Sequence, residues 1–248
     1  MRPDPIKAEL KSSFQRMRDA ILLAGTGVIL ALPYLIDRAH ALFPRLFEKP
    51  ATPELVRLFT VFVIILYSVA LLLIAMIGIY ANQKAGLQPF KRPPLKKLAA
   101  ASALGLAMIP AAYLLYDHLA LYLIPELYPS KLLVAVLYPF SLSFPEELFA
   151  RYGLLSLFAW IFGKSWNKRM LANVLAALLL TMYSSMDFFR LAPLEPTSTE
   201  IILFLFGAFL QQLIAGELYL KNGFWGSLAF TFTLSLKSPL YFFLFLNR

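Results

Sequence analysis

The sequence predicts an all-α fold: a polytopic transmembrane helix bundle of about seven spans with its N-terminus in the cytoplasm. Hydrophobic residues make up 60% of the 248 residues and charged residues only 15%, whereas soluble domains are about half apolar and about a quarter charged. Several segments contain about 20 residues with few charges, the length that a helix needs to cross a bilayer. The basic residues also fall in alternate loops, as in multi-pass membrane proteins.

Seven stretches are apolar and long enough to span a membrane. They cover about residues 20–36, 57–80, 98–124, 131–163, 168–189, 200–220 and 224–246. Before them, Ile6, Leu10, Phe14 and Met17 recur at helical spacing between basic residues, which predicts a short amphipathic helix in the membrane interface. The chain therefore divides into an interfacial segment, 1–19, and a single transmembrane domain, 20–248.

Lys and Arg gather in the N-terminal stretch and in the loops after the second, fourth and sixth predicted spans. They are Arg2, Lys7, Lys11, Arg16, Arg18, Lys84, Lys91, Arg92, Lys96, Lys97, Lys164, Lys168, Arg169 and Lys221. Cytoplasmic loops are enriched in Lys and Arg. The pattern thus places the N-terminus in the cytoplasm and the C-terminus outside, and predicts a multi-pass protein of the cell inner (plasma) membrane.

The composition also excludes several kinds of function. The net charge of +9 is explained by the cytoplasmic loops, so we expect no nucleic-acid partner. The chain has no cysteine, which rules out disulfides and thiolate metal sites. With two histidines a histidine-built metal site is not expected either, and no cofactor is predicted.

The span 131–163 contains the polar group of greatest interest, Glu146, Glu147 and Arg151, near its middle. Pro139 and Pro145 should kink or break this helix. One interpretation is structural: Ser143 followed by Glu146 is a capping-box pattern, so the acids could mark a helix start. The other is functional, because an ionisable group inside a bilayer costs at least about 2.5 kcal/mol and usually lines a cavity or pathway.

Helical geometry predicts different roles for the two acids. Glu147 and Arg151 are four residues apart and should pair on one face. Glu146 lies about 100° around the helix and cannot share that arginine equally. It is therefore the candidate general base for water.

Glu-Glu-x-x-x-Arg within a transmembrane helix resembles the first motif of the CPBP family, which includes type II CAAX prenyl endopeptidases and bacteriocin-immunity relatives. The stretch from Gly216 to Leu228, with its glycines and Trp225, resembles the approach to the family's last motif. The likeness covers about residues 130–236. It implies a glutamate-dependent intramembrane protease in which the first glutamate, here Glu146, activates water beside family histidines that hold the oxyanion.

The chain departs from the family pattern at those histidines. Its own two are His40, in a predicted loop, and His118, in the third span. By the resemblance, Asp187 and Thr231 take the two histidine positions and Ser235 the position of the family's Asn or Asp. Asp cannot stabilise an anion unless protonated and Thr is a weak donor, and each lost oxyanion donor costs about 100- to 1,000-fold in rate.

The remaining polar residues in the spans have simpler interpretations. Lys237 requires an acidic partner, for which Glu146 and Asp187 are the candidates. Asp117 and His118 are interpreted as a wetted pair at the membrane boundary rather than a catalytic dyad. We expect Glu217 and Lys221, four apart, to form an ordinary ion pair, and Gln211 and Gln212 to bond between helices.

Two functional hypotheses follow. The first is a CPBP-like protein resembling a glutamate-dependent intramembrane protease, of reduced or lost activity, whose site comprises Glu146, Glu147, Arg151, Asp187, Thr231 and Ser235. The second is a non-catalytic membrane subunit that uses the same site to bind a helix, peptide or lipid in a larger complex. A third, less favoured, is a transporter with a proton relay. The expected partners are membrane lipids and a membrane protein or peptide substrate.

Overall fold

The described part of the chain is helical with short connections and contains no strand, as predicted. The computed structural model describes residues 5–47, 52–125, 128–129, 131–191 and 197–246, with the side chains of 5–11, 45–46, 187–191 and 246 left out. In chain order the elements are α1 (Pro5–Phe47), α2 (Pro53–Ala85), α3 (Leu95–Ala112), the π-helix η1 (Tyr113–Asp117), α4 (His118–Leu123), α5 (Leu132–Glu147), the π-helix η3 (Leu148–Leu155), α6 (Ser156–Phe162), α7 (Trp166–Leu191), α8 (Ser198–Ser235), α9 (Lys237–Tyr241) and the π-helix η4 (Phe242–Leu246).

Six helices among the described residues are long and apolar enough to cross a membrane, against about seven predicted spans. The difference lies in the last of them, Ser198–Phe245, which at 48 residues is longer than one crossing needs. Inside it Gly223 is not helical, with φ 72° and ψ −170°. The predicted boundary between spans six and seven, residues 221–223, falls at this break.

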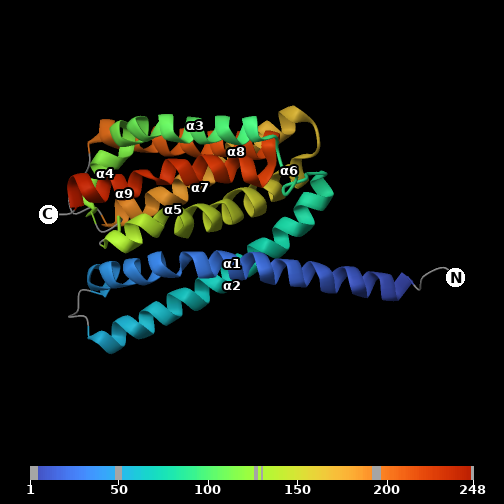
Figure 1. The fold of residues 1–248 in the computed structure, drawn as a ribbon, viewed down its shortest axis with the longest axis horizontal. Helices are drawn as coiled ribbons and strands as arrows, with labels where there is room; N and C mark the ends of the chain where they lie inside the picture. The colour runs from blue at the N-terminus through green and yellow to red at the C-terminus, as the bar shows by residue number, and fades with distance from the viewer. Residues whose placement is uncertain (1–4, 48–51, 126–127, 130, 192–196, 247–248) are drawn as a thin grey trace.

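The chain folds back on itself at Gly223. Gln211, before the break, and Lys237, after it, both bond to the hydroxyl of Tyr116. Figure 1 shows the start of α8 and the C-terminal α9 at the same end of the bundle. Gly223 is suited to this turn because its positive φ is costly for residues with a Cβ, and because a Cβ here would meet the Pro89 carbonyl oxygen at 2.5 Å.

The first helix is longer than its predicted span. α1 runs from Pro5 to Phe47 without interruption, so the described part of the predicted interfacial segment, residues 5–19, continues directly into the first transmembrane segment. His40, predicted in a loop, lies inside this helix. The loop prediction at this residue was wrong because the helix does not end with the predicted span at residue 36 but continues to Phe47.

Helix ends carry the expected local signals. The Thr52 side chain accepts a hydrogen bond from the Leu55 amide, with a proline directly after the cap, and α2 ends at Gly86 with φ 66°. α8 begins with a capping box between Thr197 and Glu200, which satisfies amide groups that the first helical turn leaves unpaired.

The helix α5 lies at the centre of the bundle. It packs against α1 on one side and α8 on the other, an arrangement visible in Figure 1. Its continuation η3 packs on α2, where Leu71, Leu148, Tyr152 and Phe224 are fully or almost fully buried. We call Glu146, Glu147 and Arg151 the acid motif. It therefore lies on α5 and its continuation η3, which have neighbouring helices on both sides.

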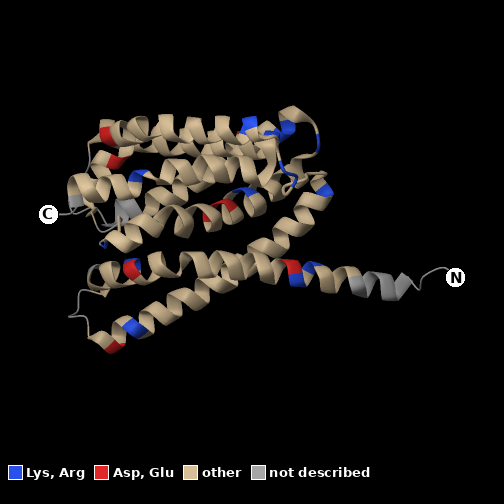
Figure 2. Cartoon of the chain, in the orientation of Figure 1, with Lys and Arg blue, Asp and Glu red and all other residues tan. Residues whose placement is uncertain are grey.

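Positive charge gathers at one end of the bundle. Figure 2 shows Lys and Arg around the connections α2–α3 and α6–α7, at the end where the N-terminal part of α1 also lies. Because the basic loops alternate along the sequence, they were predicted to lie at the same end of the bundle, as they do. Six long apolar helices make the chain a multi-pass membrane protein.

Close approach of α2 to η3 provides a test of this packing. A Cβ on Gly78 would lie 2.6 Å from the backbone oxygen of Tyr152, whereas a Cβ on Gly25 would meet nothing within 4 Å. Both substitutions to alanine raise helix propensity by about 1 kcal/mol. We expect Gly25→Ala to be neutral or stabilising and Gly78→Ala to lower the free energy of unfolding by about 1–3 kcal/mol, measured by unfolding in mixed micelles. Equal stability of the two variants would contradict the packing.

Candidate functional site

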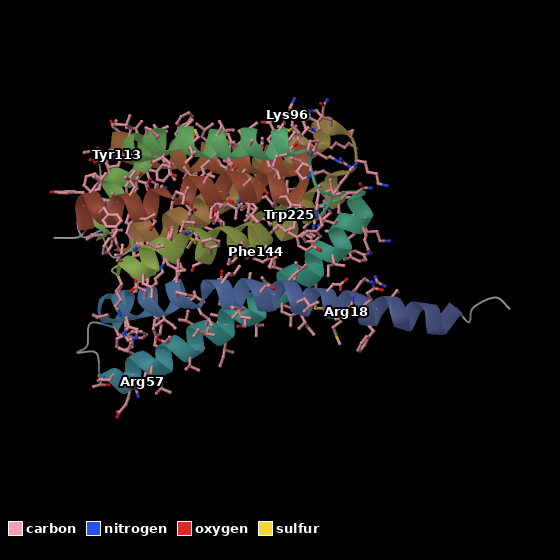
Figure 3. The ribbon with its side chains drawn as sticks, in the orientation of Figure 1. Arg18, Arg57, Lys96, Tyr113, Phe144 and Trp225 are labelled. Atoms are coloured by element: carbon pink, nitrogen blue, oxygen red, sulfur yellow. The ribbon has the colours of Figure 1, made fainter. Side chains whose placement is uncertain are left out.

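The acid motif lies within a continuous helix, not at a helix start. Ser143 is the twelfth residue of α5, which begins at Leu132, so the capping-box interpretation of Ser143 and Glu146 was wrong. Pro139 and Pro145 do not break the helix either, since α5 continues through both. The irregularity comes one turn later, as the π-helix η3, Leu148–Leu155. Phe144, close to the acids in sequence, lies near the middle of the bundle in Figure 3.

Glu147 and Arg151 form the predicted ion pair and are almost completely removed from solvent. The Arg151 Nη1 atom lies 3.7 Å from Glu147 Oε1, with the side chains 2% and 0% exposed. Arg151 Nη2 also donates to the backbone oxygen of Gln212 on α8, at 3.2 Å. The pair thus ties η3 to α8, and removal of either partner would leave a buried uncompensated charge.

Glu146 is directed elsewhere, as helical geometry predicts. Its side chain is only partly buried, and its Oε1 accepts a hydrogen bond from Gln212 Nε2 at 3.1 Å. It is also close enough to the hydroxyl groups of Tyr67, Tyr116 and Tyr138 to interact with them electrostatically. The two adjacent carboxylates therefore have separate partners.

Thr231 lies beside the second glutamate of the pair. The side chains of Ser227 and Thr231 face Glu147, but each hydroxyl donates to a backbone carbonyl of its own helix. Neither carboxylate oxygen of Glu147 has a hydrogen-bond partner among the described residues. Rotation of either hydroxyl group would supply one, so this buried polar cluster has unused hydrogen-bonding capacity.

The other resemblance-based positions have different outcomes. Ser235 is buried and accepts a hydrogen bond from Ser143 at 3.2 Å, joining α8 to α5. Asp187 belongs to α7, but its side chain is outside the described residues. The structure therefore brings together Glu146, Glu147, Arg151 and Thr231 around α8, with Ser235 one turn further along the same helix.

The histidines stand apart from this group. His40 and His118 are both exposed, and the ring of His118 bonds to the Tyr113 carbonyl oxygen of its own helix at 2.9 Å. The described residues contain no group of three or more His, Asp or Glu side chains that could hold a metal ion.

Lys237 pairs with Asp117 rather than with Glu146, one of its two predicted partners; the other, Asp187, has its side chain outside the described residues. Its Nζ lies 2.7 Å from Asp117 Oδ2. Tyr241 and Tyr128 donate to the two oxygens of the same carboxylate, at 3.1 and 2.7 Å. Asp117 is 2% exposed, so its interpretation as a wetted boundary residue was also wrong.

The positions of Asp117 and Lys237 within their predicted spans could have indicated this second polar cluster. Asp117 and Lys237 lie at similar distances from the outer ends of the third and seventh predicted spans, so opposite charges stand at the same depth. Asp117 is the last residue of the π-helix η1, whose wider turn changes which side chains face inward. Hydropathy alone carries no information about that change.

Two further sequence predictions are confirmed. Gln211 and Gln212 bond between helices, to Tyr116 and Glu146 respectively. Glu217 and Lys221 form an exposed ion pair at 2.5 Å. Because Gln211 and Gln212 are adjacent on α8, they connect the Asp117 cluster and the acid motif through one turn of helix.

Comparisons with protein-family models, curated proteins and solved structures find no match for the chain.

The Asp117–Lys237 pair gives a second prediction. Lys237→Met leaves a buried carboxylate without its cation and should lower the free energy of unfolding by about 3–5 kcal/mol. Adding Asp117→Asn should recover more than half of that loss. Lys221→Met, which breaks an exposed pair, should cost at most about 1 kcal/mol. If the Lys237 and Lys221 variants unfold alike in mixed micelles, the buried pairing is wrong.

Proposed function

We propose that this protein is a CPBP-like inner-membrane protein that resembles a glutamate-dependent intramembrane protease and has reduced hydrolytic activity. The observation that carries the proposal is the separation of the two acids. Glu147 is neutralised by Arg151, while Glu146 is partly accessible and, among the described residues, hydrogen-bonded to the amide side chain of Gln212. A structural ion pair accounts for one of these carboxylates and leaves the other for chemistry.

In this proposal Glu146 acts as the general base. Its carboxylate takes a proton from a water molecule, the water oxygen bonds to a peptide carbonyl carbon, and the carbonyl electron pair moves to its oxygen. Glu146 then returns the proton to the leaving nitrogen as the C–N bond breaks. General acid–base catalysis of this kind contributes about 100- to 10,000-fold in rate.

Activity is expected to be reduced because the site offers poor hydrogen-bond donors for the oxyanion that forms during hydrolysis. Gln212 Nε2 is a neutral donor next to Glu146. Thr231, at a family histidine position, faces Glu147 and donates to the backbone oxygen of Ser227. A donor that must first leave another acceptor stabilises a developing charge poorly, and loss of one donor costs about 100- to 1,000-fold.

The second candidate is a non-catalytic membrane subunit that binds a partner helix, peptide or lipid at this site. The Gln212–Glu146 hydrogen bond favours it, because this bond already satisfies one carboxylate oxygen of the proposed base. In that case the buried polar groups bind the partner. A hydrogen-bond donor on the partner would replace Gln212 as the donor to Glu146.

Hydrolysis in a reconstituted membrane distinguishes the candidates. Purified protein in vesicles is incubated with prenylated CAAX peptides and with membrane-embedded helical peptides, and products are followed by mass spectrometry. We expect slow cleavage that falls at least about 100-fold in Glu146→Gln and is unchanged in Glu217→Gln, a control at an exposed glutamate. Cleavage that is absent, or that survives Glu146→Gln, would contradict the proposal. Absent cleavage with a protein partner retained through purification would favour the second candidate.

A further inference from the structure

A basic pocket lies at the positively charged end of the bundle, away from the acid motif. Its volume is about 680 Å³, and its walls come from the α2–α3 connection, the start of α7 and the turn at Gly223. Five cationic side chains line it and no acidic one does: Lys91, Arg92, Lys97, Arg169 and Lys221. Figure 2 shows this gathering of blue where α3 begins.

The pocket is built from fixed backbone rather than from loose loops. Phe224 donates its amide to the Pro89 carbonyl oxygen at 2.7 Å, which holds the α2–α3 connection against the turn in α8. Arg169 on α7 donates to the Ala85 carbonyl oxygen at the end of α2, at 3.0 Å. Three parts of the chain that are distant in sequence thus meet at this pocket.

Among the described residues, one of the five cationic side chains of the pocket has an acidic partner. Lys221 pairs with Glu217, which leaves four cationic side chains in the lining without an acid between them. The Nε atom of Arg169 is buried and has no hydrogen-bond partner within the described part of the chain. A buried N–H donor without a partner is costly, and an anion with several oxygen acceptors would satisfy it.

A second cavity continues from this pocket along the helices. It measures about 420 Å³ and shares Lys97, Lys221 and Asn222 with the basic pocket. Its remaining lining is apolar: Ala100, Ala101, Leu104 and Leu218. From Lys97 to Leu104 the helix rises about 10 Å, so the apolar cavity follows α3 and α8 away from the charged end.

We propose that these joined cavities bind an anionic phospholipid, with the phosphate among the cations and an acyl chain between α3 and α8. The ligand must carry both a negative headgroup and an apolar tail, because one cavity is basic and the other is lined by alanine and leucine. The sequence places this end at the cytoplasmic face, where anionic lipids gather and each nearby Lys or Arg adds about 1 kcal/mol. The proposal is independent of hydrolysis at Glu146.

Lipid binding to the full chain in a neutral detergent tests the headgroup. Phosphatidylglycerol is titrated while bound lipid is counted by native mass spectrometry, with phosphatidylcholine of the same acyl chains as the uncharged comparison. We expect Lys97→Gln and Arg92→Gln each to weaken phosphatidylglycerol binding about fivefold. Lys96→Gln removes the neighbouring charge at the same end of α3 (Figure 3), outside both cavities, and should change little.

A second pair of variants tests the tail. Ala100→Trp fills the apolar cavity, whereas Ala99→Trp places the same side chain at an exposed position that lines neither cavity. We expect the first to weaken lipid binding at least fivefold and the second to leave it unchanged. Thermal unfolding is also measured with inorganic phosphate and with lipid. The comparison shows whether the site binds a phospholipid or only a free phosphate anion.

Three results would overturn the proposal. The first is equal binding of phosphatidylcholine and phosphatidylglycerol. The second is an equal loss in the Lys96 and Lys97 variants, which would indicate general surface charge. The third is evidence for an anion site without a tail cavity, given either by stabilisation with inorganic phosphate as large as that with lipid or by lipid binding that Ala100→Trp does not change.

Discussion

The buried pair of Glu147 and Arg151 is the interaction on which the arrangement of the polar centre depends. Arg151 reaches Glu147 within its own helix and the Gln212 carbonyl oxygen on α8. Because both charges are out of water, loss of either partner would leave the other as an uncompensated buried charge. The pair therefore fixes how α5 and η3 turn relative to α8, and this rotation directs Glu146 towards the side chain of Gln212.

The same helix, α8, connects three sites with different chemistry. Gln211 and Gln212 bond to Tyr116 and Glu146, Thr231 faces Glu147, and the break at Gly223 closes the basic pocket. The Asp117 cluster, the acid motif and the basic pocket thus share a single broken helix. Its fold-back at Gly223 places residues of both arms against α3 and α5.

Sequence reasoning was most successful where a rule is local or averaged over a whole span. Composition and basic loops predicted the helical bundle, and the four-residue spacing predicted the Glu147–Arg151 pair. It failed at Lys237 and Asp117 because the partner of a buried charge depends on how helices pack and on the turn of η1. Of the predicted kink or break at Pro139 and Pro145, a break does not occur, because α5 continues through both residues. The position of Thr231 beside Glu147 rather than Glu146 is likewise a matter of helix rotation.

A double-mutant cycle on Glu147 and Arg151 tests the central claim most directly. The free energy of unfolding is measured in mixed micelles for Glu147→Gln, Arg151→Gln and the double variant. If the pair is buried and mutually dependent, each single substitution costs about 3–5 kcal/mol and the double variant costs less than the sum by at least about 2 kcal/mol. Additive losses, within about 0.5 kcal/mol, would show that the two side chains do not depend on each other and would contradict this account.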